Sequence, residues 1–350
     1  MTSEIAIGSR VRKSPFYDAT ISHGVKQFSV YNHMYMPTSY GDPLAEYEAL
    51  TEKVSIWDVA VERQVEIVGH DALELVEYLS TRGMRSCKEG RSRYTPICDH
   101  KGILINDPIT LCLEKDRYWM SIADGDLLLW AQAISSERNL DCDVFEPEVS
   151  PLAVQGPKAD QTMSDLLGEW VMDIPFFGFV DTKIDGIPFL ICRSGWSGQG
   201  GFELFLTDES KGVDLWERVW EAGLKYGIHP GTPNAVERIE SELLSYRADC
   251  AASATPLELG LERFMNLERE DHFIGKEALL AEKSRGPSRR LVKILLSGEP
   301  LSAPNEEPWP AVDRSENKIG EIRVAAWSPS MKENLGLALI SSKNAGGDFK

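Results

Sequence analysis

The stretch SGWSGQGGFELFL, residues 194–206, joins a glycine-rich turn to an apolar strand. Four glycines within seven residues let the backbone approach a flat ligand closely, and Trp196 adds an aromatic face. Glu203 begins the apolar run, so its carboxylate could accept two N–H bonds from an amino-pyrimidinone edge. A plain β-hairpin is the alternative interpretation. The sequence has no GxGxxG or P-loop pattern, which disfavours a phosphate site.

A second carboxylate stands in an apolar setting within INDP, residues 105–108. Asp107 lies between two hydrophobic runs, and a carboxylate there must be paired, hydrogen-bonded or exposed in a cleft. The alternative is that Asp107 belongs to a simple turn made by Asn-Asp-Pro. Asp107 and Glu203 are therefore the candidate functional carboxylates of the chain.

Aromatic residues flank the chain break at Pro175. Trp170 precedes this proline, and three phenylalanines follow it within residues 176–179. Aromatic rings at the edge of a loop are what a quaternary or sulfonium cation needs, because the face of a ring attracts positive charge. Packing in a core is the ordinary role of each ring taken alone.

The composition excludes several classes of function. The chain has 350 residues, more than one compact core usually holds, and its net charge of −18 disfavours nucleic acid or an anionic membrane as partners. The six cysteines and six histidines are scattered, which predicts neither a zinc site nor a disulfide framework. No run approaches the ~20 apolar residues of a membrane span, and residues 1–10 lack the apolar run of a signal peptide. We expect a cytoplasmic protein without a metal.

Alternating helical and strand patterns predict an α+β protein with mixed or antiparallel sheets. Helices are expected at 43–54, 72–79, 124–135, 158–167, 210–226 and 232–246, the first two capped by Asp42 and Asp71. Strands are expected at 61–68, 94–98, 103–113, 118–123, 149–154, 182–184, 189–193 and 202–206, with a hairpin turn at 99–102. Residues 282–290 predict a linker, and runs at 291–296, 319–327 and 335–340 predict a small C-terminal β domain. On the helix at 232–246, Arg238 and Glu242 would form a surface ion pair.

The order of motifs along the chain resembles the aminomethyltransferase folate-binding family, to which the glycine-cleavage T-protein belongs. The motifs are IND at 105–107, VQGP at 154–157, GWSG at 195–198, GFE at 201–203, RIE at 238–240, PLELGL at 256–261 and FIGKEAL at 273–279. The resemblance covers nearly the whole chain. It implies an α+β fold, a three-lobed ring around a central tetrahydrofolate channel with a small C-terminal β-barrel. The folate-binding region of two lobes would span 1–285, and the barrel 286–350.

Segments near the N-terminus resemble more closely those members of the family that demethylate dimethylsulfoniopropionate. They are RKSPF at 12–16, YNHM at 31–34, WDV at 57–59 and RQVEI at 63–67. In these relatives, the positions matching Tyr94, Asp107 and Glu203 contact the pterin of tetrahydrofolate. We expect Arg238, from the RIE motif, to bind the cofactor as well.

The same resemblance implies a substrate pocket. The positions of Trp170 and Trp196 line the sulfonium pocket in these relatives, and both tryptophans are present here. Phe205 stands where a substrate-contacting tyrosine would align, and Gly198 where a lysine would, so the substrate carboxylate needs another donor. Two hydroxyls are candidates for that donor: those of Ser121 and Tyr31.

The implied reaction is methyl transfer from a small sulfonium substrate to tetrahydrofolate. A sulfonium methyl already has a good leaving group, a neutral thioether, so the reduced pterin nitrogen can attack it directly. The products would be methyl-tetrahydrofolate and methylthiopropionate. The enzyme would supply proximity and orientation, and Asp107 would orient the reacting nitrogen or relay its proton. We expect neither a metal nor a nicotinamide in this reaction.

Three other functions stay open. Demethylation of a betaine or another methylated amine needs the same aromatic pocket. The aminomethyltransferase of glycine cleavage needs a lipoyl carrier protein as partner, and the N-terminal segments count against it. A non-enzymatic folate-binding factor for iron–sulfur assembly would have a KGCYxGQE motif, which the sequence lacks. The oligomeric state also stays open, a homodimer included.

Overall fold

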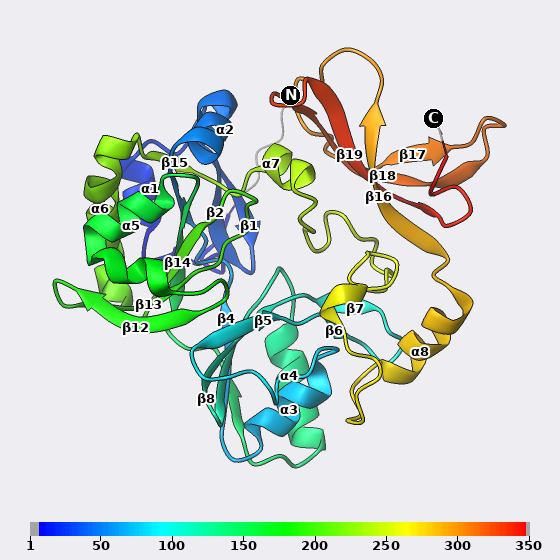
Figure 1. Cartoon of the computed structure of the whole chain (residues 1–350), viewed down its shortest axis with the longest axis horizontal. Helices are drawn as coiled ribbons and strands as arrows, with labels where there is room; N and C mark the ends of the chain where they lie inside the picture. The colour runs from blue at the N-terminus through cyan, green and yellow to red at the C-terminus, as the bar shows by residue number, and fades with distance from the viewer. Residues whose placement is uncertain (1–6, 348–350) are drawn as a thin grey trace. The chain divides into compact units, whose positions relative to one another are not determined.

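A computed structural model describes residues 7–347, which form two compact units. The first contains residues 7–64 and 146–234, and the second contains 65–145 and 235–347. Helices and mainly antiparallel sheets occur in both, which confirms the predicted α+β class (Figure 1). Of the N-terminal stretch examined for a signal peptide, residues 1–6 lie outside the described residues. In the described part, no helix is long and apolar enough to cross a membrane.

A six-stranded sheet organises the first unit. Its order is β12-β13-β14-β11-β3-β15, and β15 is parallel to β3 while the other neighbours are antiparallel. The strands are β3 (Ser55–Asp58), β11 (Ser150–Gln155), β12 (Phe179–Ile184), β13 (Ile187–Cys192), β14 (Gly201–Leu206) and β15 (His229–Gly231). Three helices cover one face of it (Figure 1): α1 (Tyr17–Ser22), α5 (Ala159–Leu167) and α6 (Gly212–Gly223).

The alternation along β14 separates core residues from candidate site residues. Phe202 and Leu204 are buried in the main core under the helices. Because successive side chains of a strand point to opposite faces, Glu203 and Phe205 project from the other face of the sheet. Ala153, which pairs with Glu203 on the neighbouring strand, belongs to a separate small cluster there. The strand therefore presents Glu203 away from the helices.

A β-hairpin near the N-terminus was not expected from the sequence. β1 (Gln27–Tyr31) pairs with β2 (Met34–Ser39) through a two-residue turn. Asn32 and His33 at this turn have φ angles of 47° and 62°. A two-residue hairpin turn with positive φ usually contains glycine, so Asn-His does not give the sequence signal for it.

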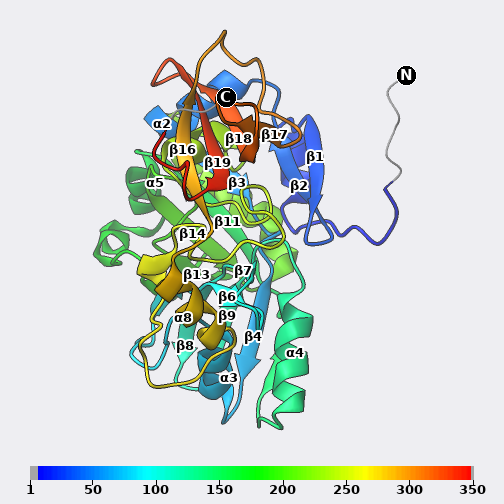
Figure 2. The same cartoon turned by 90° about the vertical axis from the view of Figure 1, so that its right-hand side faces the viewer.

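A five-stranded sheet organises the N-terminal part of the second unit. Its order is β10-β4-β9-β8-β5. The strands are β4 (Gln64–Val68), β5 (Arg91–Tyr94), β8 (Ile109–Glu114), β9 (Arg117–Ser121) and β10 (Asp143–Phe145). Helices α3 (Ala72–Leu79) and α4 (Leu127–Glu137) pack beside it around a core of their own, as Figure 2 shows. The predicted hairpin is confirmed, since β6 (Ile97–Cys98) and β7 (Leu104–Asn106) pair across residues 99–102.

A four-stranded antiparallel sheet forms the C-terminal part of the second unit, in the order β16-β19-β18-β17. The strands are β16 (Arg289–Leu296), β17 (Trp309–Val312), β18 (Lys318–Ser328) and β19 (Glu333–Ser341). β17 was not predicted, because Pro310 interrupts its pattern. Helix α8 (Lys276–Arg285) extends into the predicted linker and shortens it. The division between 1–285 and 286–350 stays a prediction.

The predicted helix at 232–246 is wrong beyond its first turns. α7 spans only Ala235–Glu240, and Glu242 has a φ angle of 56°. The backbone N–H of Ser245 donates to Asp249 Oδ2 at 2.6 Å, a bond that a continuing helix would not make. A side-chain contact to the backbone thus overrides a helical pattern that was only a weak preference.

The two predicted helix caps have different outcomes. Asp42 Oδ1 accepts from the backbone N–H of Ala45 at 3.1 Å and caps α2 (Pro43–Glu52), as expected. Asp71 makes no such cap, because its carboxylate binds the backbone N–H of Asp141 at 2.9 Å and the ring of His70 at 2.7 Å. The short 3-10 helices are η1 (Glu169–Asp173), η2 (Glu209–Lys211), η3 (Leu224–Tyr226) and η4 (Glu262–Phe264).

Candidate functional site

Tyr94 and Asp107, both predicted to bind the cofactor, are in direct contact in the second unit. The Tyr94 hydroxyl donates to Asp107 Oδ2 at 2.8 Å. Tyr94 is the last residue of β5, and β5 pairs with β8. Asp107 lies in the break between β7 and β8. The Tyr94 ring packs edge-on against Phe264 with 4.8 Å between the ring centroids. Strand pairing therefore brings together two residues that are 13 positions apart in the chain.

Asn106 fixes the backbone that presents Asp107. Its amide Nδ2 donates to the carbonyl of Ala123 at 3.0 Å, and its Oδ1 accepts from the backbone N–H groups of Ala123 at 3.1 Å and Asp107 at 3.0 Å. Pro108 has no N–H to donate, so regular strand pairing stops here. The INDP motif is a break between two strands, and its rigid backbone holds the carboxyl group of Asp107.

The surroundings of Asp107 bring the pKa of its carboxyl group close to neutral pH. Burial raises the pKa of Asp107 to about 7, the hydrogen bond from Tyr94 opposes this rise, and the nearby Asp249 carboxylate adds to it. Burial, followed by the charge of Asp107, raises the pKa of Tyr94 well above its usual value. A carboxyl group that titrates near pH 7 can take up and release a proton, which suits general acid–base chemistry.

Arg238 is buried, so the predicted surface pair with Glu242 is wrong. Its Nη1 donates to Asp249 Oδ2 at 2.7 Å, and the two residues are 5% and 0% exposed. Within the described part of the chain, Asp249 Oδ1 has no hydrogen-bond partner. The charge of Asp249 also raises the pKa of Asp107. Arg238 therefore contacts a carboxylate that influences Asp107.

Glu203, the third predicted pterin residue, lies in the first unit. The Ser194 hydroxyl donates to Glu203 Oε2, and both side chains are buried. Burial raises the pKa of Glu203, and the hydrogen bond from Ser194 opposes this rise. A carboxylate can accept several hydrogen bonds, and the bond from Ser194 uses only one of these positions. Glu203 can therefore accept N–H donors of a ligand as well.

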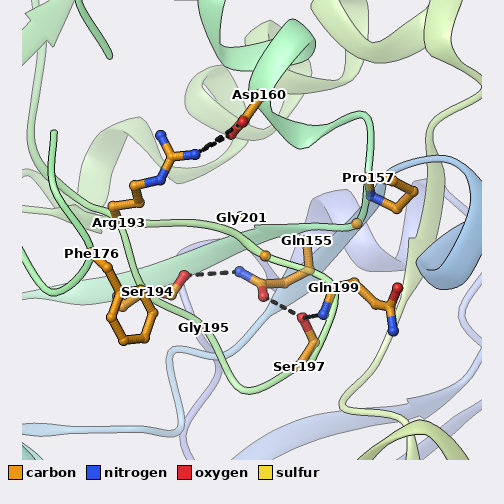
Figure 3. Close-up of a pocket in the computed structure, with 12 residues that line it drawn as sticks. Gln155, Pro157, Asp160, Phe176, Arg193, Ser194, Gly195, Ser197, Gln199 and Gly201 are labelled. Atoms are coloured by element: carbon orange, nitrogen blue, oxygen red, sulfur yellow. Dashed lines mark hydrogen bonds and ion pairs between the residues drawn. The ribbon is translucent and has the colours of Figure 1, made fainter. Parts of the chain in front are cut away.

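Gln155 holds the glycine-rich turn beside Glu203 (Figure 3). Its side chain is fully buried, its Nε2 donates to the carbonyl of Ser194 at 3.1 Å, and its Oε1 accepts from the Ser197 hydroxyl at 2.7 Å. A Cβ atom on Gly195 or Gly201 would overlap the Gln155 amide. Glycine is therefore required on both sides of the turn, because the Gln155 amide at Gly195, and the Val154 carbonyl oxygen together with this amide at Gly201, occupy the space that a side chain would need.

A pocket of about 240 Å³ opens beside this turn (Figure 3). On one side, Arg193 donates to both oxygens of Asp160 at 3.0 and 2.9 Å. The Phe176 ring lies on another side. Among the residues that the structure describes, neither Trp170 nor Trp196 lines this pocket. Its walls are therefore polar and aromatic, with Phe176 as the aromatic side.

The two tryptophans predicted to line a sulfonium pocket have different surroundings. Trp196 is partly buried within the glycine-rich turn. Trp170 lies on η1 with 38% of its surface exposed, and its Nε1 donates to the carbonyl of Leu167 at 2.7 Å. Both belong to the first unit. Their joint contact with a cation stays a prediction.

The other predicted substrate residues lie in both units. Tyr31 ends β1 and packs, partly buried, against the main core of the first unit. Phe205 is 2% exposed and faces away from the helices on β14. Ser121 ends β9 in the second unit and pairs with Ile109, two positions beyond Asp107. Of the two candidate hydroxyls, that of Ser121 is therefore on the strand pair next to Asp107.

A known protein family matches most of the chain. Residues 16–269 match the family described as the GCVT N-terminal domain. The chain belongs to this family. The resemblance to the glycine-cleavage T-protein that the sequence motifs predicted is thereby confirmed. The matched range contains all of the predicted pterin and substrate residues.

Individual members of the GCVT family are similar over nearly the full length. A dimethylsulfoniopropionate demethylase of Ruegeria pomeroyi is 40% identical over 95% of this chain and 90% of its own. An aminomethyltransferase of Caldanaerobacter subterraneus is 30% identical over 96% of this chain and 89% of its own. The crystal structure of the glycine cleavage aminomethyltransferase T of Bartonella henselae matches with a TM-score of 0.83, 22% identity and coverage of 95% and 91%, which confirms the fold.

Membership of the GCVT family also confirms the enzyme class. The chain is a methyl-transferring enzyme whose cofactor is tetrahydrofolate. Sequence reasoning missed Asp249, and it quoted Ser194 and Gln155 only as parts of motifs. The available signal for Gln155 was a glutamine at the end of an otherwise apolar strand, which must find hydrogen-bond partners when buried.

Proposed function

We propose that this chain demethylates a small sulfonium compound of the dimethylsulfoniopropionate type and transfers the methyl group to tetrahydrofolate. The main support is the 40% identity, over 95% of the chain, to a protein named dimethylsulfoniopropionate demethylase. The similarity to an aminomethyltransferase is lower, at 30% identity. The products are methyl-tetrahydrofolate and methylthiopropionate.

The side chains fit a reduced pterin by their hydrogen-bonding chemistry. A pterin presents amino and ring N–H donors, which need carboxylate or carbonyl acceptors. Asp107 and Glu203 are two such acceptors, and burial raises the pKa of each. Buried carboxylates are costly without donors, so N–H groups of a ligand would stabilise their ionised forms. Tyr94 would help to fix the ligand beside Asp107.

The reaction requires orientation and the movement of one proton. When bound, tetrahydrofolate supplies the nitrogen that accepts the methyl group, while the electrons of the broken C–S bond stay on sulfur in a neutral thioether. Asp107 orients that nitrogen and takes up its proton, for which a pKa of about 7 is suitable. Tyr94 donates to the ionised carboxylate and holds its position. Trp196 offers a π face that attracts the sulfonium cation.

Two other donors are alternatives for an enzyme of this fold. A betaine or another methylated amine would need the same aromatic surroundings, and the absence of a hydroxyl at Phe205 and of an ammonium at Gly198 keeps this donor in consideration. The 30% identity to an aminomethyltransferase supports glycine cleavage as the second alternative, with an aminomethylated lipoyl carrier protein as donor.

One assay separates these functions. The protein is incubated with tetrahydrofolate and, in separate reactions, with dimethylsulfoniopropionate, glycine betaine or an aminomethylated carrier protein. We expect methyl-tetrahydrofolate and methylthiopropionate only in the first reaction. Product from the betaine alone would replace the proposed donor. Methylene-tetrahydrofolate from the carrier protein would replace methyl transfer by aminomethyl transfer and would leave only tetrahydrofolate as the one-carbon acceptor in place.

A further inference from the structure

A basic segment precedes Tyr94 in an otherwise acidic chain. The net charge of the whole chain is −18, yet residues 82–93 contain five lysines or arginines and only one acidic residue. This segment leads from the end of α3 into β5, which ends at Tyr94. A local concentration of positive charge attracts anionic ligands, so its position next to a predicted pterin residue is relevant to ligand binding.

Two arginines of this segment, Arg82 and Arg93, lie close together. Both are partly buried, and across residues 7–347 neither has a carboxylate within ion-pair distance, whereas Arg85 pairs with Asp271. Burial lowers the pKa of Arg82, and the charge of Arg93 lowers it further. Two like charges at close range repel each other, and an anion bound between them would offset this repulsion.

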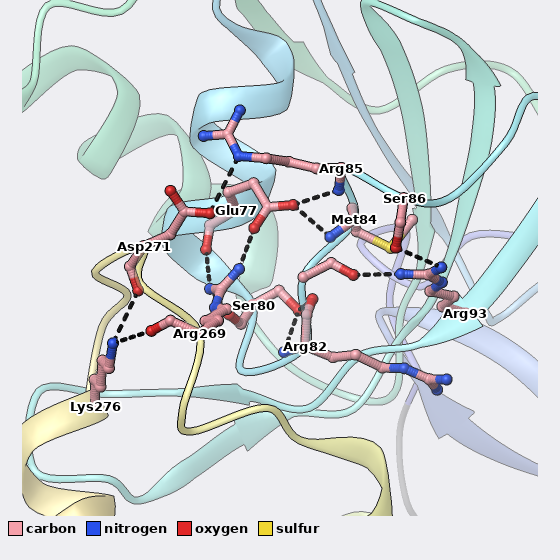
Figure 4. Close-up of polar contacts among 11 residues, drawn as sticks. Glu77, Ser80, Arg82, Met84, Arg85, Ser86, Arg93, Arg269, Asp271 and Lys276 are labelled. Carbon is pink, nitrogen blue, oxygen red and sulfur yellow. Dashed lines mark hydrogen bonds and ion pairs between the residues drawn. The ribbon is translucent and has the colours of Figure 1, made fainter.

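Neutral groups hold both guanidinium groups in place. Arg82 Nη1 donates to the carbonyl of Tyr94 at 3.4 Å. Arg93 donates from Nη1 to the carbonyl of Gly83 at 2.6 Å and from Nη2 to the Ser86 hydroxyl at 3.0 Å. A guanidinium group has more N–H donors than these bonds use. In Figure 4 both guanidinium groups lie on the right, away from the pair of Glu77 and Arg269.

A buried ion pair fixes the turn that presents Arg82. Glu77 pairs with Arg269 and accepts from the backbone N–H of Arg85 at 2.6 Å (Figure 4). Ser80 Oγ accepts from the backbone N–H of Arg82 at 3.1 Å and donates to its carbonyl at 2.7 Å. The turn is thus rigid before any ligand binds, which reduces the entropy lost on binding.

We propose that Arg82 and Arg93 form a binding site for a carboxylate of a ligand that reacts beside Tyr94. A planar guanidinium group matches a carboxylate through two parallel hydrogen bonds. Two ligands have such a group: tetrahydrofolate in its glutamyl part and dimethylsulfoniopropionate in its propionate. The inference rests on the proposed function for the second ligand, because Phe205 leaves the carboxylate of that substrate without the donor expected from the family.

The test compares each ligand with an analogue that lacks the carboxylate. Calorimetry gives the affinities for tetrahydrofolate and its glutamyl dimethyl ester, and kinetics give KM for dimethylsulfoniopropionate and its methyl ester. The double variant R82Q/R93Q should weaken one acid about tenfold or more and leave its analogue unchanged. The acid that no longer binds better than its analogue is the ligand whose carboxylate the two arginines bind. Lys88→Gln removes an exposed charge from the same segment and should change none of these values.

Several outcomes would overturn the inference. R82Q/R93Q with a native melting temperature and both preferences intact would exclude the site. An equal loss in Lys88→Gln would assign the effect to the general field of the segment. If R82Q/R93Q does not fold, R82K/R93K keeps the charges but loses the paired hydrogen bonds, and it should still lose part of the preference. If the wild type shows no demethylation, the calorimetric comparison still decides for or against a folate carboxylate at this site.

Discussion

Asp107 gives the first prediction at the scale of single residues. Its usual pKa is 3.8, and burial raises the pKa to about 7 in the folded protein. The neutral form is thus favoured by folding, and its contribution to stability is present below about pH 4 and lost as the pH rises through about 7. Catalysis needs the ionised form, so kcat/KM should rise with pH towards a plateau above about 7. Asp107→Asn should remove this rise and lower turnover by ~10²–10⁴.

The pH–rate profile and a urea titration at several pH values measure both effects. In Asp107→Asn, the decrease in stability between about pH 4 and 7 should also become smaller. Asn106 should not be used as the control, because its amide fixes the backbone of Asp107. A profile with the same apparent pKa in Asp107→Asn would assign the titration to another group.

Glu203→Gln tests the pterin contact in the first unit. The amide oxygen can still accept from Ser194, so the fold should tolerate the change. An acceptor-only carboxylate is replaced by a group with two N–H donors, which should weaken tetrahydrofolate binding by roughly tenfold or more. Calorimetry with tetrahydrofolate measures this, and the melting temperature serves as the control. Unchanged affinity would remove Glu203 from the pterin site.

The tryptophans give a third prediction at this scale. Trp196→Leu keeps apolar bulk but removes the π face, and a desolvated cation over such a ring gains ~2 kcal/mol. KM for the sulfonium donor should therefore rise roughly thirtyfold while folate binding stays unchanged. Trp170→Leu should act alike, and its 38% exposure predicts little loss of stability. A stable variant with normal sulfonium kinetics would eliminate that tryptophan, whereas a lower melting temperature with both ligands weakened would indicate a structural role.

Residue type in its local context predicted the candidate acids but not their partners. Asp107 and Glu203 were recognisable because each is a carboxylate within an apolar run. The partner of Arg238 could not be recognised in this way, because Asp249 lies 11 positions away on an irregular segment. The pKa of Asp107 depends on burial by distant parts of the chain, which no local pattern specifies.

At the scale of elements, periodicity was informative wherever one face is buried. The strand at 202–206 was predicted correctly because Phe202 and Leu204 face a core while the turn before it is rich in glycine. The helix at 232–246 failed because contacts of Asp249 end it early. The β1–β2 hairpin escaped detection because its turn contains no glycine.

The glycine-rich turn and β11 give a prediction at this scale through a double-variant cycle. Gln155→Ala removes a fully buried amide and leaves the Ser194 carbonyl without that donor, which should cost about 1–3 kcal/mol. Gly195→Ala should also destabilise, because its φ of 154° is unfavourable for alanine and its Cβ would overlap the Gln155 amide. In the double variant the overlap is absent, so the combined loss should be smaller than the sum. Chemical unfolding measures all three, and strictly additive losses would contradict the packing argument.

The whole molecule shows why local patterns could not define its compact units. Each unit consists of two separate stretches of the chain, so the division depends on long-range contacts. In the second unit, the backbone N–H of Leu104 donates to the carbonyl of Ala254 at 2.9 Å, and both residues belong to one small core. A pattern read over a short window has no information on such a contact. The order of motifs did predict the fold family, because it spans nearly the entire chain.

Turnover should require neither a bound metal ion nor a nicotinamide. Among residues 7–347, no three His, Cys, Asp or Glu side chains are grouped as ligands of a metal ion would be, and the six cysteines form no disulfide. The chemistry agrees, because a sulfonium donor releases a neutral thioether and needs no Lewis acid to stabilise its leaving group. After treatment with a chelator and dialysis, the initial rate of methyl-tetrahydrofolate formation should equal that of a sample dialysed without the chelator. A rate that falls on chelation and returns with added zinc or iron would refute this and would direct attention to a metal-assisted step.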